Sequence, residues 1–585
     1  MPERGAATGP DSPVDTAVHA PPDAGLDSPE DPRGDLRWGS IPGLVADAAT
    51  RFADAEAVAD GDVRLSFAQL ERDALRVTGA AMAAGIHPGD RVAMWAPNMA
   101  EWIVAALGLV GAGAALVPLN TRFKGPEAAY VLTRSRARAL FTVRGFLGID
   151  YPAMLEEEDV PHLERIVLLR DDEGTTSEVT TTDEVPIFGW HEFLAGAEGV
   201  VECDEGVVGS PVDVRAERGR WHSVTGDDLS DVIFTSGTTG RPKGAMTTHA
   251  QTLRTFATWA SIVGLAEGDR YLVVNPFFHT FGYKAGIIAC LMQGATIVPE
   301  PVFDVDKVLA TVATERITVL PGPPTLYQSI LDHPRRDQYD LSSLRLAVTG
   351  AAVVPVELVQ RMRSELTFST VLTAYGLTES TGTVTMCRRG DDPHTIAQTS
   401  GRAIPGLEVR VIDDKGVELA RGEPGEIVVR GYTVVAGYFE DPDATAEAID
   451  AGGWLHTGDI GVMDDAGNVR ITDRKKDMFI VGGFNAYPAE IEGALLRHPA
   501  VTQVAVIGVP DGRMGEVGAA FVVVRPGTEV AGLGDDLVAW SRDQMANYKV
   551  PRHVEVVDAL PTNASGKVLK IELRERFAQR PVKGA

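Results

Sequence analysis

The sequence has few cysteines, and they are too far apart to form a metal site or a disulfide framework. Only three occur in 585 residues, Cys203, Cys290 and Cys387, and no two of them have a C-x-x-C spacing. This pattern excludes small disulfide-stapled folds and the usual structural zinc modules. It predicts reduced, partly buried thiols in a cytoplasmic protein.

Positive charge is also scarce. The chain has 54 lysines and arginines against 82 aspartates and glutamates, which gives a net charge of −28. Nucleic acids and anionic membranes are bound through basic surfaces, so neither is an expected partner. An anionic ligand must therefore be held by local positive groups within an acidic protein.

A long uninterrupted apolar run is absent as well. The best candidate, residues 102–119, is broken by glycines and by Pro118, so it predicts a buried helix followed by a strand rather than a transmembrane segment. Residues 1–36 are rich in Pro, Asp and Ala and lack an apolar segment. We expect them to form a disordered tail rather than a signal peptide.

Helix and strand patterns alternate after this tail. Ser66 and Gln69 form a capping box that opens a helix to about Ala84. Strands are predicted at 91–95 and 115–119, with a helix from about Glu101 between them. This alternation predicts a layered α/β fold with mostly parallel strands.

Two changes in composition divide the chain further. Between about residues 150 and 226 the sequence is acidic and rich in turn residues, which predicts a partly flexible surface excursion with a short ordered piece near 188–193. A charged patch at 474–477 is followed by a compact α+β pattern. We therefore predict an N-terminal domain at 37–475 and a C-terminal domain at 476–585.

The segment 231–250, DVIFTSGTTGRPKGAMTTHA, has the composition of a phosphate-binding loop. It predicts a strand at 231–234, a loop from Thr235 to Gly244, and a helix beginning near Thr247. Glycines let the backbone approach phosphates, hydroxyls add donors, and Lys243 adds charge. The loop is not a Walker A motif, because Lys243 is followed by glycine instead of serine or threonine.

The loop TSGTTGRPKG resembles the signature loop of the adenylate-forming superfamily, which includes acyl-CoA synthetases, luciferases and the adenylation domains of peptide synthetases. Four further motifs resemble those of the family in the same order: 375–379, 438–461, 473–477 and 561–567. The resemblance covers about Leu44 to Leu573. It implies a large multi-sheet α/β domain, a small mobile α+β domain that swings about a hinge, and ATP, Mg²⁺ and coenzyme A as cofactors.

The resemblance also implies the principal catalytic roles. Lys567 would bridge the carboxylate and the α-phosphate during adenylation, and Glu379 with Thr238 would hold Mg²⁺. Asp459 and Arg474 would fix the ribose. These assignments suit the chemistry, because negative charge develops on phosphate oxygens and must be met by preorganised cations and amides.

The remaining residues implied by the resemblance fall into three groups: the phosphate loop, the frame around adenine and the acyl-adenylate, and the hinge with its pantetheine channel. They are Thr235, Ser236, Gly237, Thr238, Thr239, Gly240 and Lys243 in the loop; Gly350, Ala351, Ala352, Tyr375, Gly376 and Thr378 in the frame; and Lys476, Gly482 and Gly483 at the hinge and channel.

Residues 275–291, NPFFHTFGYKAGIIACL, correspond to the acyl pocket of the family. His279 matches a position near the substrate carboxylate, although a packed aromatic residue is an alternative. An amino-acid substrate is disfavoured, because aromatics and glycine replace the aspartate that would bind its amino group. We expect an apolar pocket shaped by Phe277, Phe278, Phe281 and Tyr283.

Lys284 is unusual in such a segment. One hypothesis is that its ammonium contacts a polar group of the substrate, such as a keto or carboxylate oxygen. The alternative is a lysine at the surface or at a helix end.

Several blocks of the sequence resemble the CoA ligases of actinobacterial steroid catabolism, which activate a bicyclic indane propionate. This resemblance implies a bulky bicyclic propionate as the acid. The alternatives are a medium- or long-chain fatty acid, or an acceptor other than CoA, such as a carrier protein or oxygen. The residues do not define the oligomeric state, and a homodimer is compatible with them.

Overall fold

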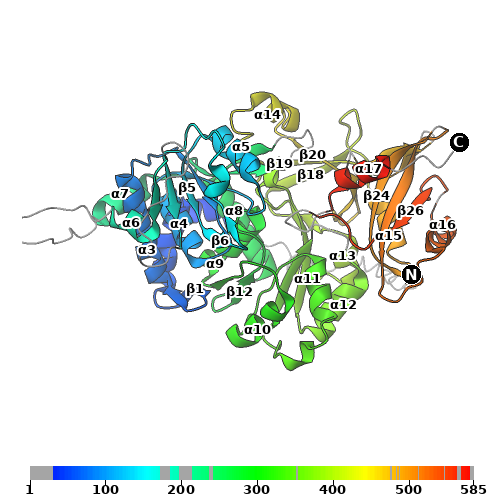
Figure 1. Ribbon diagram of the computed structural model, residues 1–585, viewed down its shortest axis with the longest axis horizontal. Helices are drawn as coiled ribbons and strands as arrows, with labels where there is room; N and C mark the ends of the chain where they lie inside the picture. Colours follow the sequence, from blue (N-terminus) through cyan, green and yellow to red (C-terminus); the bar gives the residue numbers. More distant parts are fainter. Residues whose placement is uncertain are drawn as a thin grey trace, which may run out of the picture.

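The structure, a computed structural model, describes residues 31–170, 185–196, 214–235, 242–350, 354–474, 477–481, 484–486, 488–511, 513–545, 547–562 and 568–579. A large α/β body is followed by a smaller C-terminal α+β unit, drawn in orange and red at one end of the molecule (Figure 1). The predicted fold class is therefore confirmed.

The central sheet of the large body has seven strands in the order β11-β10-β4-β3-β5-β8-β9. All neighbouring strands are parallel except β10 and β11, which agrees with the predicted pairing. The strands are β3 (Arg91–Trp95), β4 (Ala115–Pro118), β5 (Ala137–Thr142), β8 (Arg165–Leu168), β9 (Ile187–Gly189), β10 (Leu229–Thr235) and β11 (Lys243–Thr248).

Two helices that pack on one another show why the apolar run at 102–119 belongs to the core. Helix α3 (Phe67–Ala83) begins at the predicted capping box, where Ser66 and Gln69 bond reciprocally. Helix α4 (Ala100–Gly111) is buried along almost its whole length. Gly108 permits the close contact, since a Cβ there would lie 2.4 Å from Val77 Cβ. No helix in the described ranges has the length and apolar composition needed to cross a membrane.

Two four-stranded sheets are joined edge to edge through Val319, which bridges Tyr271 of β12 and Leu346 of β14 in parallel. The carboxyl ends of β12, β14 and β15 therefore lie along the same edge. The first sheet has β12 (Arg270–Val273), β13 (Thr296–Pro299), β1 (Glu56–Asp60) and β2 (Val63–Ser66), and the second has β14 (Leu346–Gly350), β15 (Thr370–Tyr375), β16 (Thr385–Met386) and β17 (Arg402–Ala403).

Two more sheets follow. The sheet β18-β19-β20-β21 consists of β18 (Leu407–Ile412), β19 (Gly425–Gly431), β20 (Leu455–Met463) and β21 (Val469–Arg474). The C-terminal sheet consists of β22 (Phe479–Val481), β23 (Phe484–Ala486), β24 (Val501–Asp511), β25 (Gly515–Val524) and β26 (His553–Val556). The predicted domain boundary at 475/476 thus falls between the last strand of one sheet and the first strand of the next.

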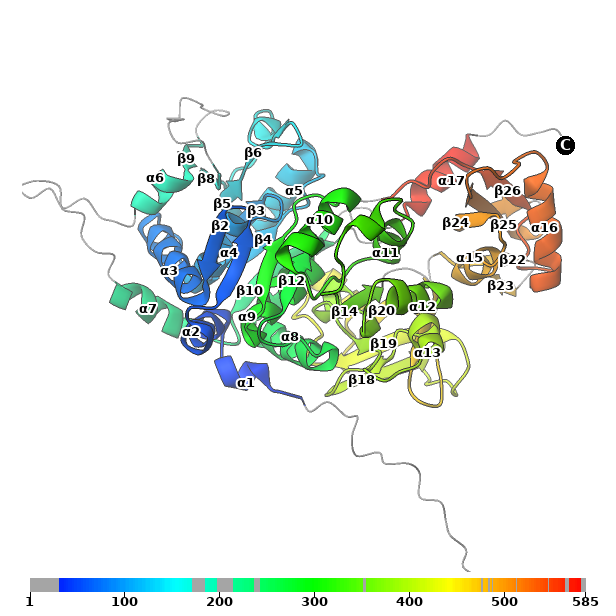
Figure 2. The same ribbon diagram turned by 90° about the horizontal axis from the view of Figure 1, so that it is seen from below.

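The helices of the C-terminal unit cover both sides of its sheet, and α17 lies on the side nearer the large body in both views (Figures 1 and 2). These helices are α15 (Pro488–Leu495), α16 (Leu533–Gln544) and α17 (Lys570–Ala578). Other helices of the large body are α1 (Gly34–Trp38), α2 (Ile41–Phe52), α5 (Gly125–Ser135), α6 (Trp190–Ala195), α7 (Val214–Ser223), α8 (His249–Val263), α9 (Ala289–Gln293), α10 (Val305–Glu315), α11 (Pro324–Leu331), α12 (Val356–Glu365), α13 (Pro393–Gln398) and α14 (Pro442–Ala448).

The N-terminal tail and the cysteines are only partly described. Residues 1–30 of the predicted tail lie outside the described residues. The last part of that prediction is wrong, because α1 begins within it and Asp31 forms an ion pair with Arg254 at 2.6 Å. Cys290 and Cys387 are buried free thiols, and Cys203 is outside the described residues.

The segment after the phosphate loop differs from the prediction. A strand, β11, occupies positions where we expected the loop to end and a helix to start, and it forms an antiparallel hairpin with β10. Helix α8 begins later, at His249, after the N-cap Thr248. Pairing with β10 along its whole length, from Lys243 to Thr248, explains the strand.

The acidic excursion is more ordered than predicted. The expected piece near 188–193 is present as β9 and α6. In addition, β8 and β9 extend the central sheet, and Trp221 of α7 donates a hydrogen bond to Thr78 of α3 at 2.8 Å. The excursion therefore contributes to the body of the domain on both sides of residues 171–184 and 197–213, which lie outside the described residues.

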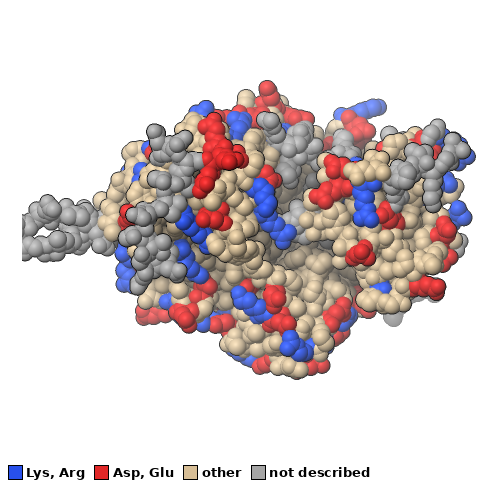
Figure 3. All heavy atoms as spheres, in the orientation of Figure 1, with Lys and Arg blue, Asp and Glu red and all other residues tan. Residues whose placement is uncertain are grey.

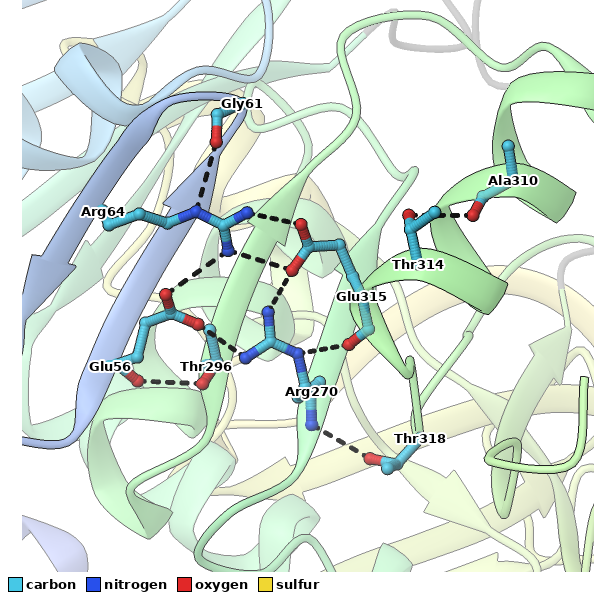
Figure 4. Close-up of polar contacts among 9 residues, drawn as sticks. All are labelled: Glu56, Gly61, Arg64, Arg270, Thr296, Ala310, Thr314, Glu315 and Thr318. Atoms are coloured by element: carbon cyan, nitrogen blue, oxygen red, sulfur yellow. Dashed lines mark hydrogen bonds and ion pairs between the residues drawn. The ribbon is translucent and has the colours of Figure 1, made fainter. Parts of the chain in front are cut away.

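A charged network joins β1, β2, β12 and α10 at the edge of the mixed sheet (Figure 4). Arg270 binds Glu56 at 2.5 Å and also pairs with Glu315. Arg64 binds Glu315 at 2.5 Å and Glu56 at 3.3 Å. Each carboxylate therefore bridges two guanidinium groups, and the pKa of Glu315 is lowered, chiefly by its hydrogen bond from Arg64.

Replacing Arg270 by Met should lower the unfolding free energy of the large body by about 1–2 kcal/mol, because two carboxylates lose one partner each. A group with a lowered folded-state pKa stabilises the fold above its unfolded pKa, so the penalty should be full above about pH 4.3 and should shrink as the pH falls further. Thermal melting of both proteins at pH 7 and below pH 4 would measure this. An equal penalty at both pH values would contradict the network's role.

Candidate nucleotide and acyl site

The carboxylate of Glu379 is the meeting point of three chain segments. Its Oε1 accepts hydrogen bonds from Thr235 Oγ1 and from Tyr438 OH, both at 3.0 Å. Thr235 ends β10, and Glu379 lies in the short 3-10 turn η5 (Thr378–Ser380) that follows β15. The predicted phosphate-loop strand and the predicted 375–379 motif are therefore in direct contact.

Tyr438 reaches Glu379 because residues 436–439 pair with β11. Ala245 and Tyr438 form an antiparallel bridge, and Phe439 N donates to Gly244 O at 2.8 Å. Burial, and then the charge of Glu379, raises the pKa of Tyr438. The phenol therefore stays protonated and donates to the carboxylate.

Lys243, the predicted lysine of the phosphate loop, is the first residue of β11. Its Nζ lies 5.4 Å from the centre of the Tyr438 ring and 4.0 Å from Glu447 Oε2. The Glu447 side chain is 76% exposed, so this long ion pair is weak and leaves the lysine available to a phosphate. A cavity of about 290 Å³ opens beside Lys243, lined also by Tyr130, Arg134, Pro242, Gly244, Phe439 and Asp441.

The predicted ribose aspartate and the predicted adenine tyrosine touch one another. Tyr375 OH donates to Asp459 Oδ2 at 2.6 Å. Arg474 is the backbone partner of Asp459 in the pairing of β20 with β21, which places both predicted ribose residues side by side. Because Tyr375 is four residues before Glu379, this pair and the Glu379 cluster belong to one site.

Two glycines of the predicted adenine frame allow the backbone to pack closely. A Cβ on Gly376 would lie 2.3 Å from Gly382 O, and a Cβ on Gly350 would lie 2.7 Å from Ala374 O. Both distances are far below van der Waals contact, so these positions require glycine. Thr378, the fourth described residue of this frame, begins η5 and is half-buried.

The acyl segment leaves β12 and is fixed by Asn98 before it enters a π-helix, η3 (Phe281–Ile288). Asn98 Nδ2 donates to the carbonyls of Val273 and Asn275 at 2.9 and 3.0 Å, and Asn98 Oδ1 accepts from Phe277 N at 2.7 Å. His279 is exposed, and its Nδ1 accepts from Phe281 N at 3.2 Å. The exposed imidazole is accessible to a ligand. The alternative, a packed aromatic residue, would instead be buried.

The predicted aromatic lining is partly wrong. Phe277 and Tyr283 are fully buried, and both rings pack on Trp102 of α4, with ring centres at 5.0 and 5.6 Å. They are core residues and face no open cavity. Phe278 and Phe281 are half-buried, and Phe281 packs edge-on against Trp259 of α8.

Both hypotheses for Lys284 are wrong in this structure. The side chain is fully buried, so it is not a surface lysine, and its Nζ lies 3.0 Å from Asp231 Oδ1 of β10. Its partner is a carboxylate of the chain itself rather than a substrate. Burial lowers the pKa of Lys284.

Several predicted site residues lie outside the described residues, and their roles stay predictions. They are Ser236, Gly237, Thr238, Thr239, Gly240, Ala351, Ala352, Lys476, Gly482, Gly483 and Lys567, and the side chain of Arg474 is likewise not described.

Three residues that shape the site were missed by sequence reasoning: Tyr438, Asn98 and Asp231. Tyr438 opens the 438–461 segment, which we used only for its aspartate. Asn98 occupies the loop between β3 and α4, where an Asx side chain commonly bonds backbone groups. Asp231, a charge inside an otherwise apolar strand, was the visible signal of a buried partner.

The arrangement suits a magnesium nucleotide. The Oε2 atom of Glu379 has no donor within the described part of the chain, and no group of three or more His, Cys, Asp or Glu there is arranged to hold a metal ion by itself. Mg²⁺ typically takes one or two carboxylates together with phosphates and waters, so a single carboxylate beside a phosphate loop fits it. On the face seen in Figure 3, acidic and basic side chains are interspersed, without one dominant basic patch.

Comparison with known proteins agrees with this geometry. Residues 45–439 match the AMP-binding enzyme family, and residues 490–567 match the AMP-binding enzyme C-terminal domain. The chain belongs to the AMP-binding enzyme family. The crystal structure of the anthranilate CoA ligase AuaEII in complex with anthranoyl-AMP is similar, with a TM-score of 0.78 and 28% identity over 92% of this chain and 97% of that one.

Two curated relatives are more similar in sequence. The 3-[(3aS,4S,7aS)-7a-methyl-1,5-dioxo-octahydro-1H-inden-4-yl]propanoyl:CoA ligase of Rhodococcus jostii is 53% identical over 92% of this chain and 98% of its own length. The ligase of the same name from Mycobacterium tuberculosis is 49% identical over 92% and 99%. Within its family, the chain is an acyl-CoA ligase, an enzyme class that uses ATP and CoA.

Replacing Gly376 by Ala should displace the turn between Tyr375 and Glu379, because the new Cβ would meet the Gly382 carbonyl. We expect the rate of acyl-adenylate formation to fall by about 10²-fold, the usual cost of a displacement near 1 Å at a reacting centre. ATP–pyrophosphate exchange measures this rate. Gly219→Ala is the control, because a Cβ there has no neighbour within 4 Å. Wild-type exchange by Gly376→Ala would contradict the close packing.

Proposed function

We propose that the acid substrate of this ligase is a bicyclic indane propanoate with keto groups, of the kind named for its relatives from Rhodococcus jostii and Mycobacterium tuberculosis. The observation that carries this proposal is 53% and 49% identity over nearly the full length of both relatives. The human medium-chain acyl-CoA ligase ACSF2 is only 32% identical, so a fatty acid remains the second candidate.

In the first step, the substrate carboxylate attacks the α-phosphate of ATP and pyrophosphate leaves. Lys567 is proposed to bridge the substrate carboxylate and the α-phosphate. His279 of the acyl segment is proposed to lie near the same carboxylate. Asp459 and Arg474 hold the ribose, while the loop residues 235–244 cradle the phosphates. The negative charge that develops on phosphate oxygens is met by donors that are already in place.

Glu379 and Thr238 are the proposed protein ligands of Mg²⁺, which would neutralise charge on the phosphates. The two hydrogen bonds to Oε1 orient the Glu379 carboxylate and leave Oε2 for the cation. Tyr438 keeps this orientation because its raised pKa keeps the phenol protonated across the physiological range.

In the second step, the CoA thiolate attacks the acyl carbonyl and AMP leaves. The C-terminal domain is proposed to turn about Lys476, which removes Lys567 and lets Gly482 and Gly483 line the pantetheine channel.

We further propose a cytoplasmic location, where ATP and CoA are present. A homodimer stays a prediction, which light scattering of the purified protein would test.

The substrate proposal is tested by incubating the protein with ATP, Mg²⁺, CoA and a panel of acids, and following AMP and acyl-CoA by mass spectrometry. The panel contains the indane propanoate, fatty acids of several lengths, benzoates and amino acids. We expect the highest kcat/KM for the bicyclic acid. A preference for linear chains would reject this substrate, and AMP release without any thioester would indicate a different acceptor.

Replacing Glu379 by Gln should raise the Mg²⁺ concentration needed for half-maximal adenylation by about tenfold, because the neutral amide is a weaker ligand for a hard cation. The two donors to Oε1 can still bond the amide oxygen, so the fold should be kept. Magnesium titration of ATP–pyrophosphate exchange measures the shift. The exposed Glu447→Gln is a control that should leave the magnesium titration unchanged. An unshifted midpoint for Glu379→Gln would exclude it as a ligand.

A further inference from the structure

A fully buried ion pair connects the two halves of the site. Lys284 lies in the π-helix η3, which follows His279, and Asp231 lies in β10, which leads into the phosphate loop. Both side chains are 0% exposed, and Nζ lies 3.0 Å from Oδ1. Neither residue has a role in the chemistry described above.

The acidic end of the pair is directly linked to the nucleotide site. In β10, Asp231 and Thr235 are four residues apart in a regular part of the ladder, so their side chains lie on the same face of the sheet. Thr235 is the donor to Glu379. Asp231 Oδ2 is also held, because it accepts from Ser230 Oγ at 2.7 Å.

The basic end of the pair is directly linked to the acyl segment. Tyr283 N donates to His279 O at 3.0 Å, so the histidine backbone forms the entry to the helix. The carbonyl of Lys284 accepts from Ala289 N in a π-type i to i−5 bond. Turns of this kind are rare and occur frequently at functional sites.

The ion pair contributes more to positioning the helix against the strand than to the free energy of unfolding. Removing two charges from water costs several kcal/mol each, and apolar residues of the same volume often stabilise equally well. A single carboxylate within reach of a buried ammonium, however, specifies one position of the helix against the strand. Among the described residues, Asp231 is the only carboxylate that forms an ion pair with this ammonium, and no other group donates to Asp231 Oδ1 or accepts from Lys284 Nζ.

We propose that Lys284 and Asp231 are a positioning pair for acyl-adenylate formation, which holds the acyl-segment helix in register with the phosphate-loop strand. The inference rests on the proposed function, because the register matters when a separate carboxylate must meet the α-phosphate. In the acyl-adenylate a covalent bond joins the two halves. The transfer to CoA therefore depends much less on the pair.

The test compares the two half-reactions in Lys284→Met. We expect kcat of ATP–pyrophosphate exchange to fall by about 10²-fold, with KM for ATP and acid changed by less than about threefold. Transfer to CoA from a supplied acyl-adenylate should stay within about threefold of wild type. Equal losses in both half-reactions would show a purely structural role and overturn the inference.

Three further variants make the result decisive. Asp231→Asn keeps an acceptor oxygen and should lose less adenylation than Lys284→Met. Arg345→Met is the control, because it leaves the buried Asp269 without its arginine at the amino ends of β12 and β14, away from the carboxyl-end edge that carries the site, and it should change neither half-reaction. The double variant Lys284→Met/Asp231→Leu should regain the melting temperature but not the adenylation rate. Recovery of both would overturn the inference.

Wild-type acyl-CoA formation is measured first. If no acid yields a thioester, the proposed function fails and the inference fails with it. If the wild type is active and the variants lose both half-reactions equally, the inference alone fails.

Discussion

The shared hydrogen bonding of Glu379 Oε1 is the interaction on which the nucleotide site depends. Thr235 and Tyr438 donate to the same oxygen from segments that are two hundred residues apart in the chain. A carboxylate held in this way cannot rotate freely, so its second oxygen points in a fixed direction. The end of β10, the 375–379 turn and the 438 segment are thereby fixed relative to one another before any ligand binds.

The fold class and much of this site could be predicted, because they depend on local signals. The capping box at Ser66 and the strand at 91–95 are each specified by a few neighbouring residues. Tyr375 and Asp459 were assigned to one nucleotide from two separate motifs, and the structure adds the direct contact between them. The hairpin β10–β11 was missed because a short strand rich in Thr, Ala and Gly has little pattern of its own and is fixed by pairing with β10 and with residues 436–439.

The acyl segment shows what sequence reasoning could not supply. Its four aromatic residues look alike in sequence. In the structure, Phe277 and Tyr283 pack on Trp102 in the core, while Phe278 and Phe281 are half-buried. Lys284 was visibly unusual, but its partner is 53 positions earlier, in a strand that carries the only charge between Ser230 and Thr235. Tertiary packing decides which face of a helix contacts which strand, and the sequence of either segment alone does not specify it.

The topology explains why two chemical steps can share one scaffold. The strands β12, β14 and β15 end along one edge of a rigid sheet. The acyl segment, Gly350 and Tyr375 therefore lie along that same edge. The C-terminal unit is built differently, around a separate sheet. There Arg574 of α17 pairs with Asp477 at 2.9 Å, which joins the helix after the Lys567 segment to the residue after Lys476, the proposed hinge lysine. The residues that bind the nucleotide in the proposed mechanism thus belong to one packed body, and the segments that are proposed to move with Lys567 belong to the other.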